Sequence, residues 1–281
     1  MPTTLSRAVP SARVTIKPLA FQQERAACMP DTGDVLIKGL DIGSATDVGR
    51  VREANEDALL LLAPGDGNLL VAVADGMGGH KAGEVASDLA VKSLRSALEA
   101  ATPSIAAEQL LTRAVELANR TIWEAAAEDV EKEGMGTTLV CAMLTASGDV
   151  SIANVGDSRA YAVQAGSAAL VTIDHTWVNQ QVLGGQMSER EARVSPYRNL
   201  LTRSLGSTPR VQVDLFNNVR LGSGDALVLV SDGVTTYLDA RDVARILRES
   251  ATAQESAERL VSEAVALGGS DNATAVVVRR T

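Results

Sequence analysis

The chain has 281 residues, of which 46% are hydrophobic and 22% are charged. This balance is typical of a globular protein with one or two domains, and it excludes a disordered or low-complexity chain. Aromatic residues make up only 2% of the sequence, and the formal net charge at pH 7 is -9. Both values argue against a nucleic-acid partner, which basic and aromatic side chains would have to bind. We expect a core of Ala, Val, Leu and Ile.

The apolar segments and the cysteines bear on the location of the protein. The longest apolar runs, at 58–63 and 69–74, are far shorter than the ~20 residues of a membrane-spanning helix. Basic residues interrupt the N-terminal segment before an apolar stretch forms, so we expect no signal peptide. Two cysteines are too few for a disulfide framework. These features together predict a cytoplasmic protein without a membrane span.

Residues 1–34 differ in composition from the rest of the chain. Four of the eight prolines fall in this segment, and its apolar residues show little periodicity. We expect an N-terminal extension, mobile or loosely docked, although residues 13–21 could instead add an edge strand. The remainder, residues 35–281, shows no internal repeat or long linker and is expected to form one domain.

The first half of this domain predicts strands followed by two helices. A strand-like segment spans 34–42, and a polar loop follows it as far as residue 57. Two apolar runs, 58–62 and 69–74, flank a Gly- and Asp-rich turn and predict a β-hairpin. Helical spacing then begins near residue 83, and a second helix is predicted to start at 102–104.

The second half predicts two further hairpins, a polar segment and a final group of strands and helices. The polar segment, 176–207, has short helical patterns, and Ser188 with Glu191 forms a predicted capping box. Hairpin connections make the strand pairing antiparallel, so we expect an α+β fold in which helices cover antiparallel sheets. The predicted strands are 137–144, 150–155, 159–163, 168–173, 211–219, 226–230 and 273–279, with helices over 240–249 and 255–266.

Acidic residues lie at the ends of several predicted strands. An Asp-Gly pair after a strand is also a common turn, so each site taken alone has this second interpretation. Acids that converge in a partly buried site repel one another strongly unless cations neutralise them. Oxygen ligands without paired cysteines or histidines favour Mg²⁺ or Mn²⁺ over zinc. The acids concerned are Glu56, Asp57, Asp75, Asp157, Asp232 and Asp271.

A pair of such ions is suited to phosphoryl chemistry. Two ions can share a water molecule, lower its pKa and present it for in-line attack on phosphorus. The site would also need a cationic side chain for the phosphate oxygens. Arg50 and Arg52 lie just before Glu56 and are candidates, although each could equally be a solvated surface arginine.

Six stretches of this sequence resemble the metal-dependent type 2C serine/threonine protein phosphatases, the PPM family. They occur in the order and spacing of that family, and the resemblance extends from about residue 35 to residue 281. The Asp174-His175-Thr176 triplet and the stretch at 73–80 are similar to the bacterial branch. The six stretches are TDVGRVREANED at 46–57, VADGMGGH at 73–80, GTT at 136–138, NVGDSRAY at 154–161, SDG at 231–233 and SDN at 270–272.

This resemblance implies a four-layer α-β-β-α sandwich, in which two antiparallel sheets are flanked by helices. It implies hydrolysis of phosphoserine and phosphothreonine on proteins, by direct attack of a water bound to two Mn²⁺ or Mg²⁺ ions. The expected partners are phosphorylated protein substrates, and the expected role is to reverse a bacterial Ser/Thr kinase. Residues 35–281 would then be the catalytic domain, with a flap at about 176–207.

The resemblance also assigns metal ligands. Asp75 would bridge two ions, and the Gly76 carbonyl would bind one of them. Asp232 and Asp271 would complete the first ion site. Glu56 would act through a metal-bound water, and the adjacent acid, Asp57, would support the site.

Other positions of the family pattern concern phosphate and substrate. Arg52, and not Arg50, matches the phosphate-binding arginine. Asp157, together with the ligand at 232, matches the pair that can hold a third, weaker ion in bacterial members. His175 lies at the entrance to the flap, where it either contacts substrate or merely ends a strand. Many eukaryotic members have His directly after the Asp-Gly pair, proposed as a general acid, whereas this sequence has Met77 there.

Two alternatives to a general phosphatase follow from the same residues. One is a non-enzymatic member of the fold that binds phosphoproteins or regulatory partners, which predicts loss of ligand acids. The other is a regulatory phosphatase that acts on one dedicated partner, with residues 1–34 as the docking element.

Overall fold

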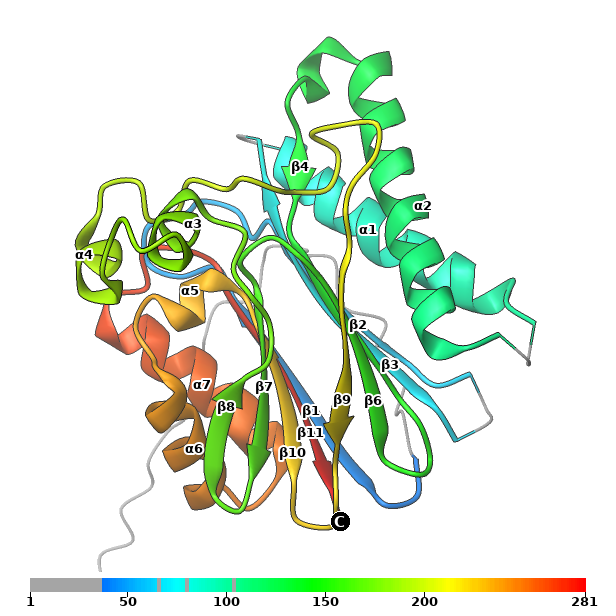
Figure 1. Cartoon of the computed structure of the whole chain (residues 1–281), viewed down its shortest axis with the longest axis vertical. Coiled ribbons are helices and arrows are strands. Elements are labelled where there is room, and N and C mark those ends of the chain that lie inside the picture. Colours follow the sequence, from blue (N-terminus) through cyan, green and yellow to red (C-terminus); the bar gives the residue numbers. More distant parts are fainter. Residues whose placement is uncertain (1–36, 65–66, 79–80, 103–104) are drawn as a thin grey trace, which may run out of the picture.

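The computed structural model describes residues 37–64, 67–78, 81–102 and 105–281. The predicted extension 1–34, with its alternative edge strand at 13–21, lies outside these residues. In the described part, two antiparallel sheets pack against each other and helices cover the outer face of each (Figure 1). This is the four-layer α-β-β-α sandwich that the family resemblance implied.

Each sheet is antiparallel throughout and combines strands that are distant in the sequence. The first sheet runs in the order β1 (Leu40–Asp47), β11 (Ala273–Arg280), β10 (Ala226–Val230), β7 (Arg159–Gln164) and β8 (Ser167–Leu170). The second runs in the order β2 (Asp57–Leu62), β3 (Leu69–Met77), β5 (Leu139–Leu144), β6 (Asp149–Val155) and β9 (Asp214–Arg220), with β4 (Gly136–Thr137) paired to the end of β3.

The helices divide between the two outer faces and the flap. On the second sheet lie α1 (Ala82–Glu99) and α2 (Ala107–Glu128), and on the first lie α6 (Ala240–Glu249) and α7 (Ala253–Leu267). The flap carries α3 (Trp177–Leu183) and α4 (Glu189–Val194), and the short α5 (Asp232–Thr235) follows β10. None of the described helices combines the length and apolar character needed to cross a membrane.

The central strands are apolar on both faces because each sheet lies between two packed layers. Successive side chains of a strand point to opposite sides. Along β3, Leu70, Ala72 and Ala74 therefore pack under the helices, whereas Leu69 and Val71 pack between the sheets. As expected from the composition, the core is built mainly of Ala, Val, Leu and Ile. The hydrophobic residues of the core include a single aromatic residue, Tyr161, in the described part of the chain.

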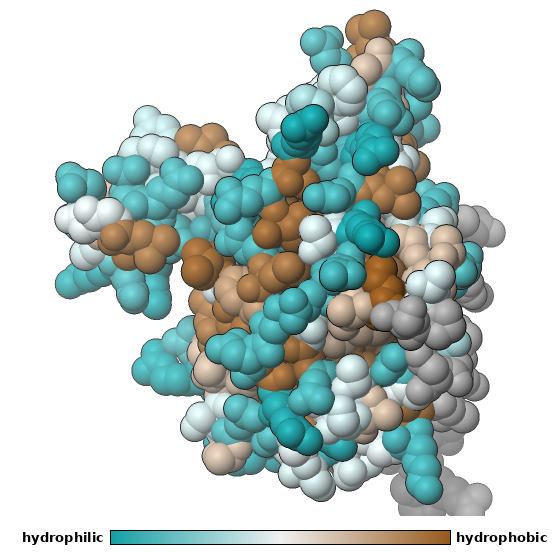
Figure 2. Space-filling model, turned by 45° about the vertical axis from the view of Figure 1, so that its right-hand side comes forward, coloured by the Kyte–Doolittle hydropathy of each residue, from teal (hydrophilic) through white to brown (hydrophobic). Residues whose placement is uncertain are grey.

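The flap is the part of the chain that departs most from these layers. In Figure 2 it projects at the left, where α3 and α4 lie in Figure 1, and its surface is largely hydrophilic with separate hydrophobic patches. The predicted capping box begins α4: the Ser188 side chain accepts from the Glu191 N–H, and the Glu191 carboxylate accepts from the Ser188 N–H. Local sequence signals therefore fix the start of α4.

The first strand differs from its prediction. The polar sequence after Ile42 predicts a loop, but β1 continues to Asp47. Every residue of this extension pairs with β11, from Gly43 opposite Val277 to Asp47 opposite Ala273. Pairing with a distant strand thus overrides a local sequence that is poor in strand-forming residues. The extension carries the chain toward Arg52 and the site acids.

Candidate active site

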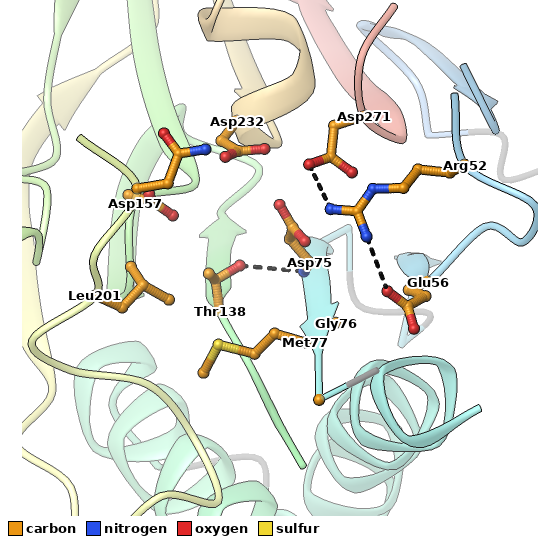
Figure 3. A pocket seen from close by; sticks show the side chains of 12 residues that line it. Arg52, Glu56, Asp75, Gly76, Met77, Thr138, Asp157, Leu201, Asp232 and Asp271 are labelled. Carbon is orange, nitrogen blue, oxygen red and sulfur yellow. Dashed lines mark hydrogen bonds and ion pairs between the residues drawn. The ribbon is translucent and has the colours of Figure 1, made fainter. Parts of the chain in front are cut away.

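Five acids from distant parts of the sequence surround one cavity of about 310 Å³ (Figure 3). Such a volume is at the lower end for ligand pockets, so the cavity suits a small group rather than a large cofactor. Asp75 lies in the middle, with its carboxylate toward the space between Asp232 and Asp271. The acids that line the cavity are Glu56, Asp75, Asp157, Asp232 and Asp271.

Strand pairing places Asp75 at this position. The β2–β3 register sets it opposite Asp57. Its N–H donates to Thr138 Oγ1 at 3.1 Å, and its carbonyl accepts from the Thr138 N–H at 2.9 Å. The backbone of Asp75 is therefore held on both sides, and its side chain is directed into the cavity.

The glycines that follow two of the acids serve close packing rather than turns. Gly76 lies within β3 and does not have a positive φ angle. A side chain there would overlap the carbonyl oxygen of Gly83 at the start of α1. Gly233 is similar, because a side chain would overlap the carbonyl oxygen of Asn272. The turn interpretation of these two Asp-Gly pairs is therefore wrong, and glycine is needed so that neighbouring segments approach the acids.

Asp57 lies behind the cavity and does not line it. Ser231 Oγ donates to Asp57 Oδ2 at 2.8 Å and accepts from the Thr274 N–H at 3.0 Å. The second oxygen of Asp57, Oδ1, is buried without a hydrogen-bond partner, and so is Oδ1 of Asp232. Buried polar atoms without partners are rare, so both oxygens mark a place suited to a positive ligand.

Asn272 organises the loop that carries Arg52 and Glu56, a contribution that the sequence interpretation missed. Its Oδ1 accepts from the Glu56 N–H at 2.8 Å, and its Nδ2 donates to the carbonyls of Val48 and Ala54, each at 2.9 Å. An amide side chain can bind three backbone groups at once because it has both donor and acceptor atoms. The position of Asn272 directly after Asp271 was the available signal.

Arg52 is the cationic side chain that lines the cavity. Its Nη2 donates to Asp271 Oδ2 at 2.8 Å, and its Nη1 lies 3.8 Å from Glu56 Oε2. The hydrogen bond to Asp271 raises the pKa of the guanidinium. Arg50 does not line the cavity, and its backbone N–H donates to the Gly269 carbonyl at 2.7 Å. Arg52 thus lines the cavity and Arg50 does not, although the spacing of the two residues from Glu56 made both candidates for binding phosphate.

Four carboxyl groups in and behind the cavity have raised pKa values in the absence of cations. Burial, followed by the charges of neighbouring acids, raises the pKa of Asp75 well above its ordinary value. The same causes raise the pKa of Asp157 to about 8 and that of Asp57 to about 7. Burial and the charge of Asp271 also raise the pKa of Asp232. Arg52 alone does not balance this set of acids.

The donor set fits hard divalent cations. All the side chains concerned offer carboxylate oxygens, which Mg²⁺ and Mn²⁺ prefer. In the described part of the chain, no three His, Cys, Asp or Glu side chains already close around one point as a complete ion site. The two unpartnered oxygens and the raised pKa values nevertheless show where positive charge would be stabilised. The cavity is thus an acidic site with one arginine at its rim.

His175 contacts the flap but does not line the cavity. Its side chain is buried, and its ring nitrogens lie at hydrogen-bond distance from Gly156, Asp214 and Arg203. Burial lowers the pKa of the imidazole despite the hydrogen bond to Asp214. The ring of His175 is therefore enclosed among protein groups of the flap, of β9 and of the segment before Asp157.

The flap adds cavity residues that had no clear sequence signal, beside others that lie in the stretches of the family pattern. Asn199 and Leu201 reach it from the flap, and Met77 lines it at the position after the Asp-Gly pair. Thr138 lines it from the segment that follows β4. The flap residues lie outside any regular element, so no periodicity indicates which of them face the site.

Comparison with known proteins identifies the family. The model of the protein phosphatase 2C family matches residues 49–266. The serine/threonine phosphatase stp of Listeria monocytogenes is 39% identical over 238 residues, which are 84% of this chain and 94% of that protein. Protein phosphatase PhpP of Streptococcus pneumoniae is 34% identical over 242 residues, covering 85% of this chain and 97% of the relative.

Solved structures agree with these relatives. The serine/threonine phosphatase Stp1 from Staphylococcus aureus superposes with a TM-score of 0.81 at 38% identity, over 88% of this chain and 97% of that one. The catalytic domain of the phosphatase PstP, solved with two manganese ions, gives a TM-score of 0.74 at 32% identity, over 85% and 97% of the two chains. With its acidic cavity and its matching sheets, the chain belongs to the protein phosphatase 2C family.

Proposed function

We propose that this protein is a divalent-metal-dependent phosphatase that hydrolyses phosphoserine and phosphothreonine on proteins. The observation that carries the proposal is the meeting of Asp75, Asp232 and Asp271 around one cavity beside Arg52. The phosphatase names of its relatives support the same activity. The presence of every expected acid favours catalysis over a non-enzymatic binding role.

Mn²⁺ or Mg²⁺ is the cofactor that these residues suit, and we assign two principal ions to the site. Asp75 would bind both ions and the Gly76 carbonyl one of them, and Asp232 with Asp271 would complete the first ion site. Glu56 would act through a metal-bound water. Asp157 with Asp232 would hold a third, weaker ion. The two manganese ions of the PstP structure support this number. Bound divalent cations would neutralise the acids and lower the pKa of water.

Arg52 is assigned to the phosphoryl group. Its guanidinium lies at the rim with nearly half of its side chain exposed, so an incoming phosphate can reach it. A planar guanidinium can donate two parallel hydrogen bonds to phosphate oxygens. Asp271 and Glu56 hold it in place from the protein side. Asp57 would act from behind, where Ser231 fixes its carboxylate.

The partners follow from this chemistry. Phosphorylated proteins are the substrates, and a Ser/Thr kinase that makes them is the enzyme whose action this phosphatase reverses. The phosphatase names of the bacterial relatives support this role. We place the protein in the cytoplasm, in keeping with its low cysteine content.

Phosphate release from phosphoserine and phosphothreonine peptides tests the proposal. We expect turnover with Mn²⁺ or Mg²⁺ and none after EDTA, with recovery when the ion is restored. A phosphotyrosine peptide of the same sequence serves as the control for substrate class. A folded protein that releases no phosphate with any divalent cation would contradict the assignment.

A further inference from the structure

Three consecutive residues at the base of the flap, 174–176, each form hydrogen bonds with a different part of the protein. Asp174 accepts two short hydrogen bonds from Arg159, at 2.9 Å from Nε and at 2.6 Å from Nη2. Thr176 caps α3 by accepting from the Asn179 N–H at 3.3 Å. His175, between them, is the residue whose contacts reach both the flap and the acidic cavity.

On the cavity side, His175 binds both backbone groups of Gly156. The Gly156 N–H donates to His175 Nδ1 at 2.9 Å, and the His175 N–H donates to the Gly156 carbonyl at 3.0 Å. Gly156 directly precedes Asp157, which lines the cavity. On the other flank of Asp157, the hydroxyl of Ser158 lies 2.7 Å from that of Thr138. Asp157 is thus held between two anchored residues.

On the flap side, His175 holds the segment that returns to the cavity. Its carbonyl accepts from the Thr202 N–H at 2.8 Å, and its neighbour Thr176 pairs with Leu201, a residue that lines the cavity. Because Nδ1 accepts from Gly156, the ring proton lies on Nε2. Nε2 then donates to Asp214 Oδ2 at 3.1 Å.

A second donor converges on the same carboxylate. Arg203, in the same flap segment, donates to Asp214 Oδ1 through Nη1. The carboxylate therefore joins His175, the flap and β9 in one cluster. Asp214 is the acceptor that lets two donors, the imidazole and the guanidinium, lie side by side.

We propose that His175 is a positioning residue, which holds the loop of Asp157 in register with the flap segment of Leu201. A shift of the flap is transmitted to Asp157 through the side chain and backbone of this residue, and the reverse also holds. The inference rests on the proposed function for the role of Asp157, whereas the contacts of His175 stand independently. The buried imidazole acts through Gly156 and has no contact with substrate.

Two amide substitutions separate the two sides of the imidazole. In His175→Asn the amide oxygen can take the place of Nδ1 and accept from Gly156. In His175→Gln the longer side chain places its amide near Nε2, so the contact with Asp214 is kept and the one with Gly156 is lost. His175→Ala removes both contacts, and Arg245→Ala, in the distant α6–α7 region, is the control for general stability.

Two measurements apply to each variant. Amide hydrogen exchange at Gly156, measured in EDTA, reports the hydrogen bond without metal or turnover. Calorimetric titration with Mn²⁺ measures binding of the ion directly. The Mn²⁺ concentration that gives half-maximal phosphate release is measured alongside it. For His175→Ala and His175→Gln we expect faster exchange and a Mn²⁺ requirement raised about 10-fold, the usual scale for residues that orient a ligand. His175→Asn should stay close to wild type in both.

The outcomes separate this inference from the proposed function. Unchanged exchange and Mn²⁺ binding in His175→Ala and His175→Gln would overturn it, as would equal effects in His175→Asn and His175→Gln. If Arg245→Ala changed exchange and Mn²⁺ binding as much as His175→Ala does, the effect of His175 would be one of general stability. That result would also overturn the inference. If wild-type protein binds Mn²⁺ but releases no phosphate, the proposed function fails while the exchange and binding data still decide the role of His175. If His175→Ala does not fold, the comparison of the Asn and Gln variants decides.

Discussion

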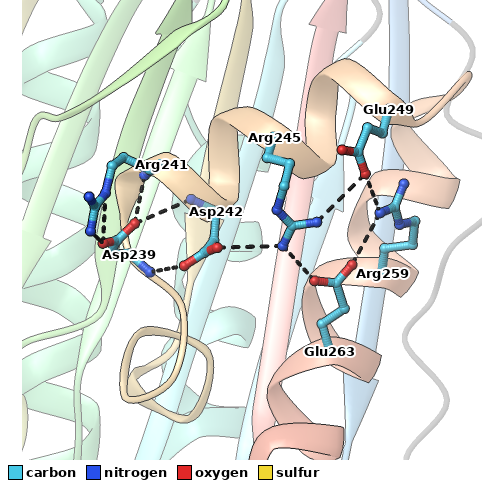
Figure 4. A network of polar contacts seen from close by, with 7 residues as sticks. All are labelled: Asp239, Arg241, Asp242, Arg245, Glu249, Arg259 and Glu263. Carbon is cyan, nitrogen blue, oxygen red and sulfur yellow. Dashed lines mark hydrogen bonds and ion pairs between the residues drawn. The ribbon is translucent and has the colours of Figure 1, made fainter.

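Two acid-rich regions of this protein use the same residue types in opposite ways. Between α6 and α7, acids and arginines alternate along the surface (Figure 4). Arg245 lies 2.7 Å from Glu263, and Arg259 lies 2.9 Å from Glu249 and 3.1 Å from Glu263. Hydrogen bonds from these arginines lower the pKa values of both glutamates. Every charged side chain of this α6–α7 network therefore has a partner of opposite charge within it. The network consists of Asp239, Arg241, Asp242, Arg245, Glu249, Arg259 and Glu263.

In the cavity the balance is reversed. Among the described residues, Arg52 is the one arginine that lines the cavity, and burial is the first cause of the raised pKa values of Asp75 and Asp157. In the network, by contrast, the hydrogen bond from Arg245 lowers the pKa of Glu263 by more than burial raises it. The network thus uses its charges to join two helices, whereas the cavity keeps unbalanced charge for a ligand.

The largest expected effect comes from removing one charge of the cavity. Asp75→Asn or Asp232→Asn keeps the shape of the side chain but removes its negative charge. We expect phosphate release to fall at least about 100-fold, the scale of losing a fixed charge at a reaction centre. In EDTA the same variants should be as stable as wild type or more so, because mutual repulsion falls.

Asp149→Asn is the matched control for this change. Asp149 is exposed at the start of β6 and does not line the cavity. The Asp149→Asn variant should therefore release phosphate at the wild-type rate. Steady-state kinetics and thermal melts measure both properties. Near-normal activity in Asp75→Asn and Asp232→Asn would show that the cavity is not the reaction centre.

A smaller effect is expected for the arginine at the rim. Arg52→Ala should raise KM for a phosphopeptide about 10-fold or more, because it removes a charge-assisted contact with phosphate. Arg50→Ala, two residues away, is the control and should leave KM unchanged. Equal KM values for the two variants would contradict the assignment of phosphate binding to Arg52.

The two regions should also respond to pH in opposite directions. With EDTA, the raised pKa values of Asp57, about 7, and Asp157, about 8, make the folded protein bind more protons than the unfolded chain above about pH 4. The contribution of these two protonated carboxyl groups to the free energy of unfolding is complete below about pH 4. It is lost as the pH rises through 7 to 8. Asp239, at the end of the network in Figure 4, has its pKa lowered to about 2 by hydrogen bonds from Arg241, so its contribution to stability is lost only as the pH falls toward 2.

Thermal melts in EDTA between pH 5 and 8.5 measure the first of these effects. We expect Tm to fall as the pH rises, with a shallower slope in Asp157→Asn. Mn²⁺ should flatten the slope of the wild type, because a bound cation favours ionised carboxylates. An identical slope in wild type and Asp157→Asn would show that Asp157 does not titrate as its burial indicates.

The smallest effect is expected in the network. Arg245→Ala removes contacts with Asp242, Glu249 and Glu263, but exposed ion pairs contribute little each. We expect Tm to fall by no more than about 4 °C, less so at high salt, with unchanged phosphate release. A loss of activity comparable to that of Arg52→Ala would break the distinction between the two regions.

The sequence predicted the acids better than the residues that place them. Asp75, Asp232 and Asp271 each follow or precede an apolar strand, a signal that local spacing carries. Hairpin spacing likewise predicted antiparallel pairing, whereas the stacking of four layers came from the family resemblance. Asn272 and Leu201 gave no comparable signal, because their roles depend on segments far away in the sequence.

His175 shows the same limit most clearly. Its place next to a predicted strand end is compatible with a residue that touches substrate, and only the packed structure shows its ring enclosed. The extension of β1 is a related case, since its polar sequence becomes a strand through pairing with β11. In both cases the deciding contacts join residues that are distant in the chain.

The pairing of β1 with β11 has a consequence for how the molecule is made. In the described part of the chain, β1 pairs with β11 alone, yet more than two hundred residues separate them in synthesis. A nascent chain must therefore carry an unpaired edge until translation has passed Arg280, and contacts of such long range slow folding. Asp271 lies just before β11, so the acidic cavity can be completed only when this late strand is in place.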